Sequence, residues 1–461
     1  MITRRRTTAG HRRAAAEQSN TDEPARGDGV RFVVTSALVG TTIEWYDFYL
    51  YGTAAGIVFN KLFFPGTDPV VATLLAFATF ALGFVARPIG GLIFGHVGDR
   101  LGRKKTLVST MTIMGVATVA IGFVPTYAQI GVWAPVGLVV LRIAQGIAIG
   151  GEWGGAVLMA VEYAPAHRRG LYGSIPQIGL ALGLMLGTGV FAGLSALLPE
   201  QAFLAWGWRV AFVASALLVV VGIAVRLRVL ETPAFRKLEH REQSASVPVL
   251  RLLRDRRSRI HILLGIGTRL AEGITFNAWA VFVLSYGTAT LGMSRQPLLV
   301  AVMIAAGVMA VFIPVFGAVS DRVGRRTTFC AGAIIACALS VPAFMALQTR
   351  NIVLIIVAVS AVLGIAFPIM YGPQAAFYAE LFPTPIRYTG SSFVYQFAGI
   401  FSSGITPFVL AALVAASGGG YLLVVGYFAA ATVVSVVCAA LVTPLFRFRF
   451  AEAPTAWWYA R

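Results

Sequence analysis

Charged residues are scarce in this sequence: Asp, Glu, Lys and Arg together make up 12% of its 461 residues. A soluble protein of this length carries about twice that share, so the composition excludes a soluble enzyme or a soluble binding domain. Short segments of alternating polarity are also missing, which excludes a membrane β-barrel. The chain instead contains one apolar run after another, each about 18 residues or longer and able to cross a hydrocarbon core of about 30 Å.

Cysteine and histidine are equally scarce. The three cysteines, Cys330, Cys337 and Cys438, lie in apolar segments without the spacing of a metal site, and the five histidines fall in tails, loops and span ends. No nucleotide-binding loop and no constellation of His, Cys and Asp accompanies the apolar runs. We therefore expect no metal, no cofactor and no enzymatic reaction.

Basic residues outnumber acidic ones, 37 to 19, which gives a net charge of +18. Nucleic-acid-binding proteins share such an excess, but here the basic residues collect in alternate loops, so we expect no nucleic acid partner. In membrane proteins the loops rich in Lys and Arg stay in the cytoplasm. The alternation therefore predicts a multi-pass protein of the inner or plasma membrane, surrounded by lipid, with both termini and the central loop in the cytoplasm.

The apolar runs predict an all-α protein with about twelve membrane-spanning helices. The first six lie roughly at 32–58, 69–98, 106–124, 133–163, 171–198 and 206–228, and the last six at 261–290, 296–320, 327–348, 351–380, 389–417 and 421–446. We divide the chain into a disordered cytoplasmic tail (1–30), a six-helix bundle (31–228), a cytoplasmic central loop (229–260), a second six-helix bundle (261–446) and a second cytoplasmic tail (447–461).

Two loop patterns each occur twice, about half the chain apart. Residues Gly95–Lys104 and Gly317–Arg326 both read G-x-x-x-D-R-x-G-R-[KR], and Glu162–Arg169 and Glu380–Arg387 share the spacing E-x-x-P-x-x-x-R. Two matched pairs indicate a duplication, and an even number of spans between the copies gives both halves the same direction through the membrane. We expect two pseudo-symmetric bundles related by an axis along the membrane normal.

The repeated loops have the chemistry of a cytoplasmic gate. Asp99 and Asp321 end their spans at the cytoplasmic side, where a carboxylate can accept hydrogen bonds from the N-terminus of a neighbouring helix. The loop arginines can pair with acids or carbonyl groups on adjacent helices. We assign the gate to the following loop residues: Gly95, Asp99, Arg100, Arg103, Glu162, Arg169, Asp321, Arg322, Arg325, Glu380 and Arg387.

The doubled loop resembles the signature of the major facilitator superfamily. Within it, Gly40–Gly52, Ala86–Gly91, Arg142–Gly155 and Glu380–Gly390 resemble the metabolite:proton symporters. This resemblance, which extends over about residues 32–446, implies the major facilitator fold of twelve helices and secondary active transport. Cargoes of that branch are carboxylates such as shikimate, 2-oxoglutarate and citrate, or zwitterions such as proline and betaine.

Ionisable residues inside membrane spans are costly and therefore mark candidate functional sites. A helix rises about 1.5 Å per residue, which places Glu44, Arg87, Glu152 and Glu272 roughly 15–18 Å from the cytoplasmic face. Charges from four spans thus meet near the midplane, where carriers bind their cargo. The alternative for each charge is a structural ion pair that fixes helix packing.

A desolvated carboxylate can exchange protons at cellular pH, whereas arginine stays charged. We therefore assign proton coupling to Glu44 and Asp47, with Arg142 modulating them; the superfamily resemblance implies such a role for an arginine of the fourth span. Two arginines are candidates for holding the carboxylate of the cargo, but which arginine pairs with which acid stays open. The full cargo site comprises Arg87, Gln145, Glu152, Gln177, Arg269, Glu272, Tyr371, Gln374 and Gln396, of which Arg87 and Arg269 are those two arginines.

These features predict a monomeric transporter that uses the proton gradient to import a small organic acid or zwitterion by alternating access. An exporter or an exchanger on the same fold is the nearest alternative. A transporter-like sensor is a further alternative, but it would need a signalling domain or a long structured tail, which we do not expect in tails of this length.

Overall fold

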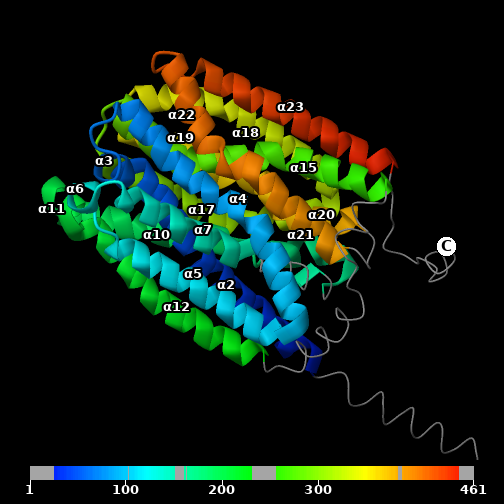
Figure 1. The fold of residues 1–461 in the computed structure, drawn as a ribbon. Helices are drawn as coiled ribbons and strands as arrows, with labels where there is room; N and C mark the ends of the chain where they lie inside the picture. The colour runs from blue at the N-terminus through cyan, green and yellow to red at the C-terminus, as the bar shows by residue number, and fades with distance from the viewer. Residues whose placement is uncertain are drawn as a thin grey trace, which may run out of the picture.

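The computed structural model describes residues 25–101, 103–150, 160–161, 164–230, 256–382 and 387–445. These residues are nearly all helical (Figure 1). In this part of the chain 9 helices are long and apolar enough to cross a membrane, and Val108–Phe123 forms a shorter apolar helix. The predicted all-helical membrane fold is confirmed. The division into tails, bundles and a central loop stays a prediction, because 1–24, 231–255 and 446–461 lie outside the described residues.

The first half of the chain consists of helical passes in the order that hydropathy predicts. The elements are α2 (Ala25–Ala54), η1 (Ala55–Phe59), α3 (Asn60–Leu62), α4 (Pro69–Leu101), α5 (Arg103–Phe123), α6 (Tyr127–Ile130) and α7 (Trp133–Gly150). They are followed by η2 (Ala166–Arg168), α9 (Arg169–Ser174), α10 (Ile178–Leu197), α11 (Glu200–Ala202), η3 (Phe203–Gly207) and α12 (Trp208–Leu230). A turn at Pro176 separates α9 from α10, which together form one pass.

The second half repeats this arrangement with more irregular helices. Its elements are α15 (Arg256–Asn277), η4 (Ala278–Phe282), α16 (Val283–Ser285), η5 (Tyr286–Thr290), α17 (Arg295–Val323) and α18 (Arg325–Gln348). They are followed by α19 (Ile352–Val359), η6 (Ser360–Ala366), α20 (Phe367–Leu381), α21 (Arg387–Gly399), η8 (Ile400–Gly404), α22 (Thr406–Ala416) and α23 (Leu422–Leu445). The elements η4, η5, η6 and η8 are π-helical turns, which occur mostly at functional sites.

Hydropathy predicted the limits of three of these helices to within three residues, whereas α2 begins at Ala25 rather than near 32 and α15 at Arg256 rather than near 261. The spans predicted at 69–98, 296–320 and 421–446 correspond to α4, α17 and α23. Helix ends fray and differ by a residue or two between definitions, so these small offsets carry no meaning. The span predicted at 133–163 is described only in part, since 151–159 lie outside the described residues.

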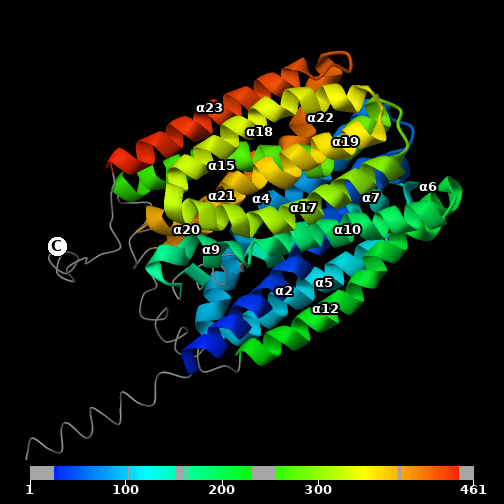
Figure 2. The same ribbon diagram turned by 180° about the vertical axis from the view of Figure 1, so that it is seen from behind.

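Both ends of the helical region lie on the same side of the molecule. Figure 1 shows the start of α2 and the end of α23 at one end of the bundle, and α3, α6 and α11 at the opposite end. We call these the terminal face and the distal face. The view from behind in Figure 2 shows α17 beside the pass formed by α9 and α10, along the length between the two faces.

The two halves pack against each other along a few helix pairs. Helix α17 packs on α9 and α10, α20 packs on α9, and α4 packs on α21, η8 and α22. Glycines let these backbones approach closely: a methyl group on Gly317 of α17 would lie 2.7 Å from the carbonyl oxygen of Gly170 in α9. No real Cβ atom approaches a carbonyl so closely, so the contact between the halves at the terminal face requires glycine at this position.

Candidate functional site

A buried ion pair lies at the centre of the second half. Arg269 and Glu272 of α15 are 3% and 4% exposed, and the Nε atom of Arg269 lies 3.2 Å from an oxygen of Glu272. Gln374 of α20 donates a hydrogen bond of 3.1 Å to the same carboxylate oxygen. Arg269 also donates to the backbone carbonyl of Tyr395 and stacks on its ring, with 3.4 Å between guanidinium carbon and ring centroid. Three predicted cargo residues thus form one hydrogen-bonded cluster.

Arg87 of α4 has a different environment. Its side chain is 1% exposed, and its guanidinium carbon lies 4.2 Å from the ring centroid of Phe84, 4.3 Å from that of Phe48 and 5.6 Å from that of Trp45. Among the described residues, its Nε and Nη2 atoms have no hydrogen-bond partner. A buried donor without an acceptor costs free energy, and more so when it carries charge. Arg87 is therefore a charged donor that three aromatic rings surround and that can still donate hydrogen bonds.

A row of aromatic rings connects the two halves beside these arginines. The ring centroids of Tyr49 in α2 and Phe276 in α15 lie 4.9 Å apart, those of Phe276 and Phe367 5.0 Å, and those of Phe367 and Tyr371 5.0 Å. Trp45 stacks on Tyr49 with 5.2 Å between centroids. The row runs from α2 across α15 to α20, so Tyr371, a predicted cargo residue, belongs to a continuous aromatic wall.

Two predicted cargo residues bridge the halves through hydrogen bonds to the backbone. Gln177, at the start of α10, donates to the carbonyl of Tyr371 at 3.0 Å, and Gln396 of α21 donates to the carbonyl of Gly150 at 3.3 Å. Within the described part of the chain, the Oε1 atoms of both side chains and of Gln374 have no hydrogen-bond partner. The amide nitrogens therefore hold helices together, while the amide oxygens remain available as acceptors.

The residues predicted for proton coupling lie on the first half. Asp47 of α2 is 0% exposed, and both of its carboxylate oxygens lack a hydrogen-bond partner among the described residues. Glu44, one turn earlier, is half-buried. No ion pair joins Asp47 to Arg142, although both are buried and both belong to the described residues. An ionised Asp47 would carry an uncompensated charge, which is costly in this environment.

Arg142 of α7 is held only in part by a chain of polar groups, since its Nε and Nη2 atoms, like those of Arg87, have no hydrogen-bond partner among the described residues. It donates a hydrogen bond of 3.1 Å to Gln145, whose amide nitrogen donates to the hydroxyl of Thr118 at 2.7 Å. Its guanidinium carbon lies 3.9 Å from the ring centroid of Phe48 and 4.4 Å from that of Tyr51. Phe48 thus contacts both Arg87 and Arg142. Gln145, predicted as a cargo residue, serves here to position Arg142.

At the terminal face, α17 of the second half binds the start of α9 in the first half. Asp321 accepts hydrogen bonds from the backbone N–H groups of Gly170 at 2.9 Å and Leu171 at 3.0 Å. Arg325 pairs with Asp321 at 2.6 Å and with Glu380 at 3.5 Å. We call these groups the terminal cluster. The predicted contact between this aspartate and the N-terminus of a neighbouring helix is present in the structure.

For the other residues assigned to the gate, the structure gives burial or a single hydrogen bond, or does not describe the side chain. Arg387 is buried and donates to the carbonyl of Phe382 at 3.4 Å, whereas Arg322 is exposed and Arg169 is half-buried. The first copy of the repeated loop and two acids stay predictions. The structure does not describe Glu152 and Glu162. It describes only the backbone of Gly95, Asp99, Arg100 and Arg103.

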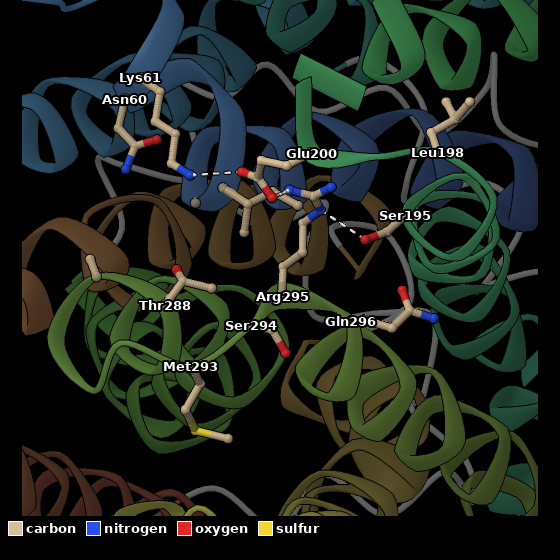
Figure 3. A pocket seen from close by; sticks show the side chains of 13 residues that line it. Asn60, Lys61, Ser195, Leu198, Glu200, Thr288, Met293, Ser294, Arg295 and Gln296 are labelled. Carbon is tan, nitrogen blue, oxygen red and sulfur yellow. Dashed lines mark hydrogen bonds and ion pairs between the residues drawn. The ribbon is translucent and has the colours of Figure 1, made fainter. Parts of the chain in front are cut away.

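At the distal face the structure adds a cluster that the sequence analysis missed. Arg295, the first residue of α17, pairs with Glu200 of α11, donates to the hydroxyl of Ser195 at 2.8 Å and stacks on Phe203 at 3.9 Å. Lys61 pairs with the same glutamate at 3.3 Å. Figure 3 shows both cations converging on Glu200. We call these groups the distal cluster. Its signal in the sequence is faint: single charges in loops that are otherwise poor in charge.

An open pocket of about 350 Å³ lies beside the distal cluster (Figure 3). Polar and apolar groups both line it, and both halves of the chain contribute to it. The polar lining residues include Asn60, Lys61, Ser195, Glu200, Thr288 and Arg295. We call it the distal pocket. In the part of the chain that the structure describes, no group of three His, Cys, Asp or Glu residues is arranged to hold a metal ion.

The profile of the Major Facilitator Superfamily matches residues 37–407. The chain is 42% identical over 386 residues to the inner membrane metabolite transport protein YhjE of Escherichia coli K12, covering 83% of this chain and 87% of that protein. It is 40% identical over 387 residues to the shikimate transporter of the same organism, covering 83% and 88%. It is 37% identical over 393 residues to the proline/betaine transporter of Salmonella typhimurium LT2, covering 84% and 78%.

The fold is also similar to solved structures. The crystal structure of a D-xylose–proton symporter superimposes with a TM-score of 0.67 at 18% identity, covering 90% of this chain and 97% of the other. At that identity the likeness concerns the fold alone. The predicted twelve-helix fold in two six-helix bundles and the predicted family are therefore confirmed, and the proteins compared are transporters rather than enzymes.

Proposed function

The chain belongs to the major facilitator superfamily and is a multi-pass membrane transporter; from that premise we propose that it imports a small carboxylated metabolite together with protons. The terminal face would lie in the cytoplasm, because the loops rich in Arg and Lys belong to that side. The distal face would then be exposed to the exterior. Transport would be driven by the proton gradient, with no further cofactor.

The observation that carries the proposal is the environment of Arg87. A guanidinium that is 1% exposed and has two nitrogen atoms without acceptors in the described part of the chain suits a carboxylate, which binds such a fork through two parallel hydrogen bonds. The aromatic cage of Phe48, Phe84 and Trp45 excludes water and strengthens that bond. Arg269 is the less suitable candidate, since Glu272 already occupies it.

The rest of the central region suits hydroxyl or ammonium groups on the cargo. The amide oxygens of Gln177, Gln374 and Gln396 are acceptors without partners among the described residues. A hydroxylated carboxylic acid could satisfy these acceptors while its carboxylate occupies Arg87. The similarity to the 40% identical shikimate transporter supports such a cargo.

A zwitterionic cargo is the second candidate. The aromatic wall formed by Tyr49, Phe276, Phe367 and Tyr371 offers ring faces to a quaternary ammonium group. Glu272 of α15 would supply a negative charge in the same region. The 37% identical proline/betaine transporter makes this alternative worth testing beside the acids.

For the proton we propose Asp47 as the carrier, with Glu44 one turn along the same helix as its relay. Asp47 is fully buried without a partner among the described residues, so its neutral form suits this structure and its ionised form requires another one. Release of the proton would therefore accompany a conformational change. Arg142 would not pair with Asp47 in this state but would become available if Phe48 moved.

The test is uptake into proteoliposomes that contain the purified full-length protein. An imposed pH gradient, acidic on the distal side, should drive accumulation of one member of a panel consisting of shikimate, 2-oxoglutarate, benzoate, proline and betaine. Cargo-dependent alkalinisation on the acidic side would identify symport. Uptake that only equilibrates the cargo at any pH gradient would contradict proton coupling and favour facilitated diffusion, and accumulation driven by the opposite gradient would favour export.

A further inference from the structure

Arg295 is a residue of the second half whose side chain is bound almost entirely by the first half. It is 9% exposed, and Ser195, Glu200 and Phe203 all belong to α10, α11 and η3. Lys61, by contrast, joins Glu200 from within the same half. Separation of the two halves at the distal face therefore has to break the contacts of Arg295 and leaves those of Lys61 intact.

The distal pocket has an excess of positive charge. Glu200 is the one carboxylate among the lining residues that the structure describes, whereas Lys61 and Arg295 are both cations. The N-terminus of α17 also opens here, and the hydroxyl of Ser294 makes no capping hydrogen bond with it. Backbone N–H groups at such an end favour an anion. A second carboxylate would thus find two cations and an uncapped helix end.

Glu200 is the weak member of this cluster. Its side chain is 60% exposed, so water and salt screen its attraction to both cations. Arg295 is deeply buried and cannot leave without losing its stacking on Phe203. An incoming anion can therefore replace the glutamate on Arg295 while the arginine stays in place. The volume of about 350 Å³ lies within the range of small-molecule sites.

We propose that the distal pocket is a first binding site for the carboxylate of the incoming cargo, which displaces Glu200 from Arg295 and thereby weakens the contact between the halves at the distal face. The site would take small monocarboxylates and dicarboxylates and reject neutral analogues. It rests on the proposed function for the charge of the cargo and for the side from which it enters. It is separate from the central site at Arg87.

A binding measurement with benzoate tests the displacement. The protein carries R87Q so that the central arginine does not contribute, and benzoate binding is measured by isothermal titration with benzamide as the neutral control probe. We expect weak, saturable benzoate binding in this background and none of benzamide. Adding E200Q removes the internal competitor and should tighten benzoate binding several-fold. Adding R295Q should abolish it, and adding K61Q should weaken it only partly.

A second measurement follows the contact between the halves. Spin labels at Ala128 and Thr349, both exposed near the distal face, report the distance across it in a background in which the three cysteines are replaced by serine. Benzoate should increase the population with the longer distance, and E200Q should do so without benzoate. K61Q, the matched control, should keep the short distance.

The proposal is overturned if E200Q binds benzoate no tighter than its R87Q parent, or if R295Q binds it equally well. It is also overturned if benzoate leaves the distance between Ala128 and Thr349 unchanged in the otherwise native protein. Failure of the proposed function would appear in a different measurement. Uptake would show no carboxylate cargo or no pH dependence, while E200Q would still lengthen the distance between Ala128 and Thr349.

Discussion

A single residue, Phe48, contacts both buried arginines, Arg87 and Arg142. The ring of Phe48 lies 4.3 Å from the guanidinium carbon of Arg87 on one helix and 3.9 Å from that of Arg142 on another. Each such contact is worth about 0.5–2 kcal/mol in a desolvated site. Asp47 directly precedes Phe48 in α2. Cargo binding at Arg87 and protonation at Asp47 would therefore act on one turn of one helix, which is an economical physical basis for coupling.

Replacement of Asp47 by asparagine tests the proton assignment. The amide has nearly the same shape but carries no titratable proton, so D47N should abolish accumulation driven by a pH gradient. Exchange of labelled for unlabelled cargo needs no net proton movement and should persist. Both are measured as uptake into proteoliposomes. D68N is the matched control, because exposed Asp68 only caps α4 and asparagine caps equally well. Full gradient-driven accumulation by D47N would refute the assignment.

Replacement of Arg87 tests the cargo site. R87Q removes the charged hydrogen bonds to a carboxylate, worth about 1.5–3 kcal/mol, and should raise the apparent KM about tenfold to a hundredfold. R87K keeps the charge but not the planar fork, so its apparent KM should lie between those of the native protein and R87Q. Initial uptake rates across cargo concentrations give these values. R350Q, a change at an exposed arginine, serves as control. An unchanged KM in R87Q would place the carboxylate elsewhere.

At the scale of helices, much of the arrangement follows from the sequence. Hydropathy predicts α4, α17 and α23 almost to the residue, because each crosses the bilayer as one apolar run. The repeated loop predicts that Asp321 binds the N-terminus of another helix, since a carboxylate at a span end has few other partners. The sequence contains no comparable pattern for Arg295. Its contacts with Glu200 and Ser195 depend on how the halves dock, which no local spacing encodes.

The sequence also does not predict which arginine of the central site pairs with Glu272. Depth along a helix places Arg87 and Glu272 near the midplane, but it does not reveal that Arg269 pairs with Glu272 while the Nε and Nη2 atoms of Arg87 have no acceptor among the described residues. That outcome depends on rotation of the helices about their axes and on the aromatic rings between them. Hydropathy and span order contain neither.

The terminal cluster supports a prediction at this scale. D321N removes the ion pair with Arg325 and weakens the bonds to Gly170 and Leu171, so the terminal face should open more often. An effect of about 1 kcal/mol, roughly a fivefold change in population, is expected for a charge at a helix end. Spin labels at exposed His167 and Val323 measure it. R259Q, a change at an exposed arginine near the start of α15 that is not assigned to the gate, should leave the distance unchanged. Equal distances in D321N and the native protein would remove Asp321 from the gate.

On the scale of the whole molecule, one helix carries the contacts that close both faces. Helix α17 has 29 residues and is therefore roughly 43 Å long. Its first residue, Arg295, binds the first half at the distal face, and Asp321 binds it near the other end. The partner is in both cases the pass formed by α9 and α10 or the turn that follows it. With both clusters formed, the two halves are in contact at both faces.

A rocking mechanism on this helix makes a quantitative prediction. E200Q should favour opening at the distal face and D321N opening at the terminal face, so the two single changes should shift the populations in opposite directions. The clusters are far apart and share no side chain, so their effects should add within about 0.5 kcal/mol. The double variant should then restore the native ratio of the two open states while reducing the closed one and lowering Tm. Spin-label distances at both faces test this in one set of samples. If E200Q instead lengthened the distance between His167 and Val323 as D321N does, the ends of α17 would not act as separate contacts, and the two halves would have to bend rather than rock as rigid bodies.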